Sequence, residues 1–238
     1  MRRLAVIACS LGLLGTLVVA HAPAAQSKDP LEFAVVAIDA IVGGDPVRSS
    51  GVVIDADKGL VLTTAHSVWG ATSLRLTTGV GVLHGRIVAR APCSDLALLE
   101  LQPRIPGLVA LEGGGKLTHP LNVVVRSADG NLEHRHRPLA ADSSGAPVVD
   151  ADQRVGGIAD ATKGRRSAVI PWSLIDERLG KLQPGPRRIY VGWRDEYACT
   201  PALHAATKAR HPRFRERDAV LNAPVPASRV PGTEELDR

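Results

Sequence analysis

The sequence is poor in aromatic residues, in methionine and in cysteine. Phe, Trp and Tyr together make up 3% of the 238 residues, with one methionine and three cysteines. A buried core must therefore be built from Val, Leu, Ile and Ala, and the short Val-rich runs favour β-strands. The chain also lacks a basic stripe interleaved with aromatic residues, so its sequence does not support nucleic-acid binding.

The first 25 residues have the pattern of a secretory signal peptide. A positive start at Arg2-Arg3 precedes the almost entirely apolar residues 4–20, and small-x-small cleavage patterns lie within residues 20–24. The alternative is a transmembrane anchor, which the short, glycine-interrupted apolar run disfavours. We therefore expect a secreted or periplasmic protein of the cell envelope, without stable membrane insertion after cleavage. Removing both arginines lowers the formal net charge from +5 to +3.

Two cysteines remain after this leader is removed. Cys9 belongs to the leader, whereas Cys93 and Cys199 belong to the exported chain. An exported pair can form a disulfide, which would tie the C-terminal part of the chain to the loop before Asp95. Two separate buried thiols are the alternative.

Short apolar runs broken by Gly, Asp, Pro and Ser predict two sets of six strands. The first set is expected at residues 33–41, 51–54, 60–63, 73–76, 82–89 and 96–101. The second set is expected at residues 109–111, 121–125, 132–136, 147–149, 155–159 and 167–170. Such spacing is typical of closed or sandwiched antiparallel sheets.

The C-terminal part has a different pattern. Apolar residues recurring on one face predict a helix over residues 172–182. An extension follows over 184–238, with an edge strand at 189–191 and a helix at 202–210, which Thr200-Pro201 would start. Residues from 222 onward are rich in proline and poor in apolar side chains, so we expect them to be extended or disordered.

His66 and Asp95 each stand at an end of a predicted strand. His66 follows the apolar Leu60-Val61-Leu62 through a short polar run, and Asp95 leads directly into an apolar strand. A carboxylate before a buried strand is costly unless it has a partner. Taken alone, each has an ordinary structural interpretation, as a strand-end histidine or as an Asp cap.

Ser144 lies in the turn Asp142-Ser143-Ser144-Gly145-Ala146-Pro147. Small neighbours would let backbone N–H groups point at a developing oxyanion, and Pro147 fixes the chain before the next strand. Most such clusters are plain turns. Ser143 is the rival nucleophile, but choosing it would put Ala146 where the turn needs Pro147.

Together, these three residues predict acyl transfer. Ser144 would attack, His66 would move the proton, and Asp95 would orient the imidazole and stabilise its cation. The order His, Asp, Ser is the chymotrypsin order. The absence of a G-x-S-x-G elbow argues against a lipase or esterase.

Three segments resemble the signatures of trypsin-like serine proteases: Thr64-Ala65-His66, Asp95-Leu96-Ala97-Leu98-Leu99 and Ser144-Gly145-Ala146-Pro147. Ala168-Val169-Ile170-Pro171 and the predicted helix after it resemble the bacterial HtrA (Do-like) branch. The resemblance covers roughly residues 33–182. It implies an all-β, chymotrypsin-like fold of two six-stranded antiparallel β-barrels with the catalytic triad in the cleft between them.

The resemblance also implies domain boundaries. A protease domain would span 31–183, with barrel one over about 31–103, barrel two over about 104–171 and the helix after them. The extension lies outside the resemblance, and we expect no PDZ domain after the helix.

The resemblance further implies substrate-binding groups. Backbone N–H groups of Asp142 and Ser144 would form the oxyanion hole. The strand edge Asp160-Ala161-Thr162 would pair with an extended substrate. The first specificity pocket would lie near Pro138, Thr162 and Val169, which are small or apolar, so we expect a small or aliphatic residue before the cut.

Two positions depart from the family pattern. Asp142 replaces a glycine of the oxyanion hole, and Asp160 replaces a neutral residue beside the triad aspartate. A carboxylate near the oxyanion is repulsive, and losing one oxyanion donor costs about 100- to 1,000-fold in rate. The alternative function is therefore a weak or inactive pseudoprotease that binds peptides or proteins.

We expect a protein or peptide substrate and no cofactor or metal. His134 and His136 share one face of a predicted strand, but the sequence supplies no third ligand beside them. A solvated strand is the better interpretation of that segment.

Overall fold

The structure is a computed structural model that describes residues 29–127, 129–136, 139–161, 168–184, 190–191 and 199–213. The predicted leader and the stretch from residue 222 onward lie outside the described residues. None of the described helices is both long and apolar enough to cross a membrane.

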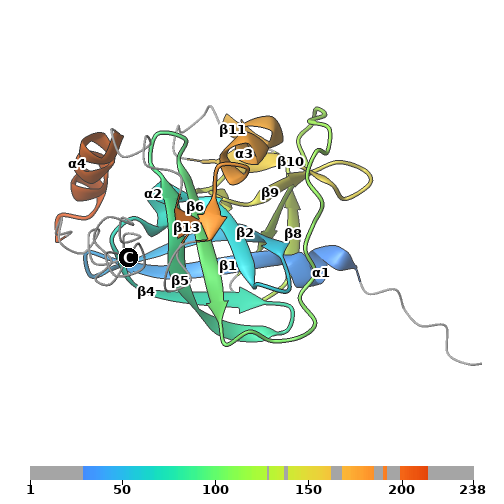
Figure 1. Cartoon of the computed structure of the whole chain (residues 1–238), viewed down its shortest axis with the longest axis horizontal. Coiled ribbons are helices and arrows are strands. Elements are labelled where there is room, and N and C mark those ends of the chain that lie inside the picture. The colour runs from blue at the N-terminus through green and yellow to red at the C-terminus, as the bar shows by residue number, and fades with distance from the viewer. Residues whose placement is uncertain are drawn as a thin grey trace, which may run out of the picture.

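The first half of the chain folds into a closed antiparallel barrel of six strands (Figure 1). Its strands are β1 (Val35–Val42), β2 (Asp45–Asp55), β3 (Leu60–Thr64), β4 (Ala71–Thr78), β5 (Gly81–Ala91) and β6 (Leu96–Gln102). They are arranged in the order β1-β2-β3-β6-β5-β4. The predicted all-β fold and its first barrel are confirmed.

Aliphatic side chains fill this barrel, as the scarcity of aromatic residues requires. Ile38, Leu76 and Leu99 are fully buried and belong to one core cluster, which also contains the buried Trp69. Burying one such aliphatic side chain contributes about 1.5–3 kcal/mol. A row of them on the inward face therefore stabilises the closed barrel.

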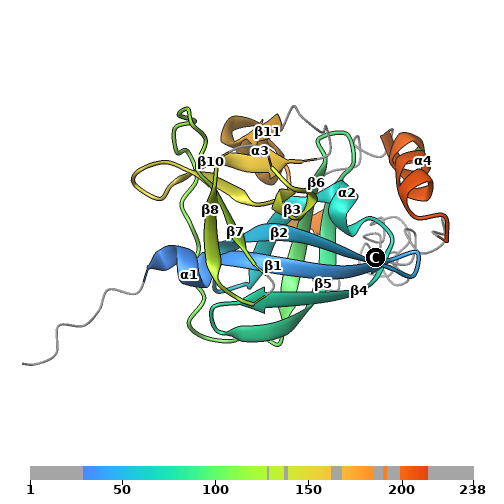
Figure 2. The ribbon, with the colours of Figure 1, turned by 180° about the vertical axis from the view of Figure 1, so that it is seen from behind.

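The second half forms a five-stranded sheet (Figure 2). Its strands are β7 (Val123–Arg126), β8 (Leu132–Arg135), β9 (Pro147–Val149), β10 (Val155–Asp160) and β11 (Ala168–Pro171). They lie in the order β11-β10-β9-β7-β8. The predicted second closed barrel of six strands is not confirmed in the described residues.

The missing sixth strand was expected at residues 109–111, which form no regular strand. The chain just after them meets β10 through a single parallel bridge between Gly113 and Val155. Gly114 has a φ of +84°, outside the β region, and a Cβ on Gly113 would lie 1.6 Å from the Trp172 ring. Residues 109–111 themselves are bonded elsewhere, because Val109 N–H donates to the Phe33 carbonyl at 3.3 Å and Leu111 N–H to the Val53 carbonyl of β2 at 3.1 Å.

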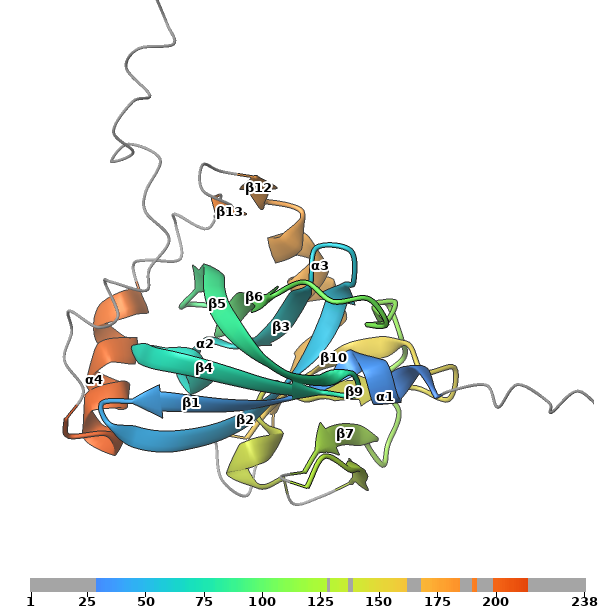
Figure 3. The same ribbon diagram turned by 90° about the horizontal axis from the view of Figure 1, so that it is seen from below.

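Short helices complete the fold: α1 (Pro30–Ala34), α2 (Ala65–Val68), the 3₁₀ turn η1 (Ala141–Ser143), α3 (Trp172–Leu179) and α4 (Thr200–Arg210). The two-residue strands β12 (Gln183–Pro184) and β13 (Tyr190–Val191) pair with each other. Figure 3 shows α4 lying across the ends of β4 and the β1–β2 hairpin. Helix α1 was not predicted; Asp29 caps it by accepting the Leu31 N–H at 3.0 Å.

Arg126 of β7 joins the second sheet to the N-terminal segment. This arginine is 4% exposed, and its Nε donates to the Val35 carbonyl at 3.0 Å. Its Nη1 lies 3.3 Å from a Glu32 carboxylate oxygen, and the guanidinium also donates to the carbonyls of Glu32 and Gly130. A buried guanidinium with several acceptors fixes the relative placement of the two halves.

Candidate active site

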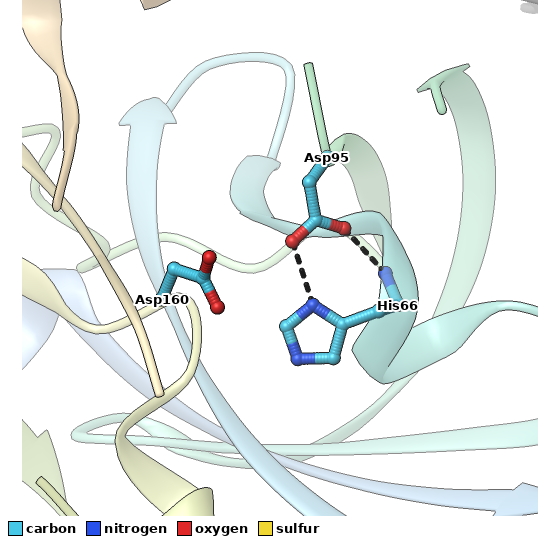
Figure 4. A group of neighbouring side chains, drawn as sticks. All are labelled: His66, Asp95 and Asp160. Carbon is cyan, nitrogen blue, oxygen red and sulfur yellow. Dashed lines mark hydrogen bonds and ion pairs between the residues drawn. The ribbon is translucent and has the colours of Figure 1, made fainter. Parts of the chain in front are cut away.

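His66 and Asp95 form a doubly hydrogen-bonded pair at the end of the first barrel. The imidazole Nδ1 lies 2.7 Å from Asp95 Oδ2, and the His66 backbone N–H donates to Asp95 Oδ1 at 2.9 Å (Figure 4). The His66 side chain is 10% exposed and that of Asp95 is 26% exposed. This geometry makes Nδ1 the donor to the carboxylate and leaves Nε2 as the nitrogen available to accept a proton.

The loop before β6 holds Asp95 in an uncommon conformation. Its φ is +53°, in the left-handed region, and its carbonyl accepts the Ala65 N–H at 2.9 Å. Such backbone conformations cost of the order of 1–3 kcal/mol and concentrate at functional sites. Helix α2 and the Asp95 loop therefore position each other through three hydrogen bonds.

The turn that carries Ser144 is clamped between β2 and β10. Ser50 N–H donates to the Ser144 carbonyl at 2.8 Å, and Gly145 N–H donates to the Ala159 carbonyl at 2.8 Å. Gly145 has a φ of +82°, and a Cβ there would lie 2.2 Å from the Ser50 carbonyl oxygen and 2.3 Å from Thr63 Oγ1. The glycine after the serine is required by both backbone angle and space.

Ser144 and His66 line the same cavity, whose volume is about 390 Å³. They are not hydrogen-bonded to each other among the described contacts. His66 Nε2 lies 3.2 Å from Ser67 Oγ, and Ser144 Oγ accepts the Ala161 N–H at 3.3 Å. The predicted base and nucleophile thus line one cavity, but His66 is bonded to Ser67 and Ser144 to Ala161.

One of the two predicted oxyanion-hole donors, the Ser144 N–H, is occupied, and the carboxylate and carbonyl of Asp142 have partners of their own. Ser144 N–H donates to the Ala141 carbonyl at 3.1 Å, inside the 3₁₀ turn. The Asp142 carboxylate lies 2.6 Å from Arg135 Nη1, and the Asp142 carbonyl accepts the Ser50 hydroxyl at 2.8 Å. The hydrogen bond that Arg135 donates to Asp142 raises the pKa of Arg135, and this effect is larger than the opposing one of burial.

Asp160 brings a second carboxylate to the His66–Asp95 pair. It ends β10, is 7% exposed, and its carboxylate faces the other two side chains in Figure 4. Potential ligand atoms of His66, Asp95 and Asp160 all lie within 4.8 Å of one another. The adjacency of the two carboxylates, which the sequence raised as a concern, is present in the fold.

Two of the five predicted substrate-binding residues lie outside the described residues: Pro138 and Thr162. Asp160 ends β10, and Ala161 directly after it donates its N–H to Ser144 Oγ. Val169 lies on β11 opposite Ala159 in the register. Ala161 and Val169 both pack on the core cluster of the second sheet. The described part of the predicted pocket is thus apolar and adjoins the serine turn.

Cys93 and Cys199 are joined by a disulfide. It ties the start of α4 to the loop before Asp95, so a helix of the C-terminal extension lies beside the candidate site. A second cavity of about 320 Å³ separates this helix from His66, Asp95 and Asp160. Of the two alternatives that the sequence left open, the disulfide is the one present, and two separate thiols are not.

Ser67 and Arg135 are the site residues that sequence analysis missed. Ser67 follows His66 directly and also hydrogen-bonds Thr64 Oγ1 at 2.7 Å. Arg135 lies between His134 and His136, the two histidines weighed as metal ligands in the sequence. Those histidines instead contact the chain before β7: His134 contacts Asn122, and His136 contacts the Leu121 carbonyl.

Comparisons with known proteins give a weak sequence match and a clear structural one. No family model matches the chain. It is 43% identical to the periplasmic serine endoprotease DegP of Escherichia coli over 54 residues, which are 22% of this chain and 11% of DegP. The chain therefore spans only a small part of the length of the curated relatives it matches.

Two solved structures show the same fold. The serine endoprotease of Yersinia pestis matches with a TM-score of 0.52 and 17% identity, over 64% of this chain and 64% of that one. The active form of the Rv3671c protease of M. tuberculosis matches with a TM-score of 0.51 and 18% identity, over 63% and 81%. The chain has the trypsin-like fold of HtrA-type serine proteases.

Proposed function

We propose that this chain is a serine endopeptidase that hydrolyses peptide bonds through Ser144, His66 and Asp95. The observation that carries the proposal is the double hydrogen bond between His66 and Asp95 at a cavity that Ser144 also lines. An aspartate bonded to Nδ1 holds the imidazole in the tautomer that can accept a proton at Nε2.

In the proposed reaction, Ser144 Oγ attacks the scissile carbonyl carbon while His66 Nε2 takes the hydroxyl proton. The resulting imidazolium is stabilised by Asp95 and then protonates the leaving amine, so the C–N bond breaks and an acyl-enzyme remains. A water molecule repeats the sequence in reverse and releases the carboxylic acid. The chemistry needs no cofactor.

Two local rearrangements accompany this mechanism. His66 Nε2 exchanges the Ser67 hydroxyl for that of Ser144, and the Ser144 N–H leaves the Ala141 carbonyl to face the oxyanion. The groups involved, on His66, Ser67, Ala141 and Ser144, all border one cavity. Catalytic hydrogen bonds are often long in proteins without substrate and tighten only in the complex.

A hydrolysis assay tests the proposal. The purified chain is incubated with an unfolded protein such as reduced, alkylated casein, beside Ser144→Ala prepared in the same way. We expect new peptides from the first protein and none from the second. Equal fragment patterns from both would contradict the assignment of Ser144.

A second candidate is a binding module that has kept the fold without hydrolysis. It is favoured by the Ser144 N–H bonded to the Ala141 carbonyl and by the Ser67 hydroxyl at His66 Nε2. Such a protein would bind extended peptides at the Asp160–Ala161 edge and leave them intact. Binding of unfolded casein without fragments, in a folded sample, would support it.

We also infer that the protein is exported to the periplasm or cell envelope. The leader pattern of residues 1–25 supports this inference, and so does the Cys93–Cys199 disulfide, which is typical of oxidising compartments. The expected partners are protein or peptide substrates. N-terminal sequencing of the protein from its native cells would give a start near residues 21–26 if the leader is cleaved.

A further inference from the structure

Helix α4 is attached to the first barrel at both ends. Its start is held by the Cys93–Cys199 disulfide, and just after its end His211 Nδ1 lies 3.3 Å from Asp45 Oδ2 on the β1–β2 hairpin. Between these points Leu203 packs on the barrel core. The helix is therefore a fixed part of the surface beside the candidate site.

This attachment places Arg210 at the cavity that holds Ser144. The cavity is bordered by β2 residues including Arg48, by the serine turn, and by Arg210 with His211 from the end of α4. Among its described lining residues there are two arginines and no carboxylate. The two arginines therefore bring positive charge to the cavity beside Ser144.

The two arginines differ in their partners. Arg48 Nη2 lies 2.7 Å from Asp39, and this hydrogen bond raises the pKa of Arg48. Arg210 is exposed and forms no ion pair with any described carboxylate. Of the two arginines, Arg210 is therefore the one whose guanidinium can form an ion pair with a carboxylate of a bound ligand.

Arg210 also lines the second cavity, which contains Asp95 and Asp160, and Asp45 lies beside the adjacent His211. The carboxylates of Asp95 and Asp160 attract the Arg210 guanidinium, and their negative charge also offsets part of the attraction between Arg210 and an acidic ligand. We therefore expect a moderate effect rather than a large one.

We propose that Arg210, carried by α4 and supported by Arg48, is a specificity-determining residue that selects an acidic side chain in the peptide bound beside Ser144. The inference rests on the proposed function only in taking the cleft as a peptide-binding site. This subsite is separate from the apolar pocket near Val169, so an acidic residue at one position is compatible with an aliphatic one at another.

Binding to the full, disulfide-bonded chain carrying Ser144→Ala tests the subsite without cleavage. The probes are fluorescein-labelled random dodecapeptide libraries that differ only in having Glu or Gln at one fixed position, scanned along the peptide. At low salt we expect one position at which the Glu library binds about fivefold more tightly. Because exposed ion pairs are screened, this preference should shrink in 1 M NaCl.

Further variants in the same background separate charge from structure. Arg210→Gln should bring the Glu-to-Gln ratio to about one, Arg210→Lys should keep most of it, and Arg210→Glu should shift the preference to a Lys library. Lys208→Gln is the matched control, because Lys208 is an exposed cation of α4 that lines neither cavity. We expect it to leave the ratio unchanged.

Three results would overturn the inference. The Glu and Gln libraries bind equally, neither library binds, or the preference for Glu persists in Arg210→Gln. The casein assay reports on the proposed function separately. If the protein hydrolyses casein but does not distinguish Glu from Gln, only the proposed acidic subsite is contradicted. If it selects Glu through Arg210 but leaves casein intact, only the proposed peptidase activity is contradicted.

Discussion

The carboxylate of Asp142 is paired with Arg135, 2.6 Å from Nη1, across the turn that precedes Ser144. Both side chains are partly buried, with 32% and 23% of their surfaces exposed. The same guanidinium donates to Ser143 Oγ at 3.2 Å. The negative side chain at the predicted oxyanion position is therefore neutralised by a cation from β8.

This pair predicts an effect of Arg135 on catalysis. Arg135→Gln leaves the Asp142 charge uncompensated near the developing oxyanion, so we expect kcat to fall about tenfold, or about 1.4 kcal/mol in barrier height. Arg135→Gln combined with Asp142→Asn should regain most of that loss. Peptide hydrolysis by the two variants measures it, and a double variant no faster than the single one would contradict the explanation.

The two acidic residues beside His66 should differ in importance. Asp95 makes both hydrogen bonds to His66, so Asp95→Asn would favour the wrong imidazole tautomer and lower kcat by about 10⁴-fold. We expect a much smaller loss for Asp160→Asn. Steady-state hydrolysis by both variants decides this, and an equal or larger loss for Asp160→Asn would reassign the orienting carboxylate.

Gly145 and Gly130 provide a matched pair for stability. Both have positive φ, +82° and +89°, but a Cβ on Gly145 would collide with Ser50 and Thr63 whereas one on Gly130 meets no atom within 4 Å. Gly130→Ala should therefore cost about 1 kcal/mol and Gly145→Ala about 3 kcal/mol or more in unfolding free energy. Urea denaturation measures both, and similar costs would show that the serine turn is looser than described.

Glu100 should make stability depend on pH. Burial raises the pKa of this carboxyl. Hydrogen bonds from Arg86 and Arg104, at 2.5 and 3.0 Å, lower it by more than burial raises it, so the folded-state pKa lies below the ordinary value of 4.5. A carboxyl with a depressed pKa stabilises the fold above its unfolded pKa, and this contribution is lost as pH falls through the folded value.

The unfolding free energy of Glu100→Gln tests that dependence. The difference from the wild type should be greatest near pH 7 and shrink as the pH is lowered below about 4.5, since only the wild type then binds the extra proton. Glu177→Gln is the control, because the Glu177–Lys181 pair is exposed and screened by solvent. A difference in unfolding free energy between the wild type and Glu100→Gln that stays constant with pH would contradict the lowered pKa of Glu100 in the folded state.

Sequence patterns predicted the first barrel well because its strands contain short apolar stretches separated by turn residues. They placed the ends less well: β2 begins at Asp45, six residues before the predicted start, because its polar half is paired with β1 rather than buried. A second closed barrel of six strands is not confirmed, since the described residues form a five-stranded sheet. Residues 109–111, expected as one of its strands, instead donate hydrogen bonds to Phe33 and Val53 in the first half of the chain.

Residue order along the chain was enough to bring His66, Asp95 and Ser144 forward as candidates. It could not predict Ser67 at Nε2 or the Ser144 N–H inside the 3₁₀ turn, because these depend on backbone angles of single residues. Arg135 and Arg210 reach the site through sheet pairing and a disulfide. Such neighbours are set by tertiary structure and have no local sequence signal.

Covalent labelling tests the central claim most directly. The folded chain is treated with a fluorophosphonate, digested, and mapped by mass spectrometry, beside Ser144→Ala and His66→Ala. We predict an adduct on Ser144 in the wild type, none in Ser144→Ala, and a greatly reduced yield in His66→Ala, because the hydroxyl is nucleophilic only with its base. An unlabelled but folded wild type, or an adduct on Ser143 or Ser67 instead, would contradict the account.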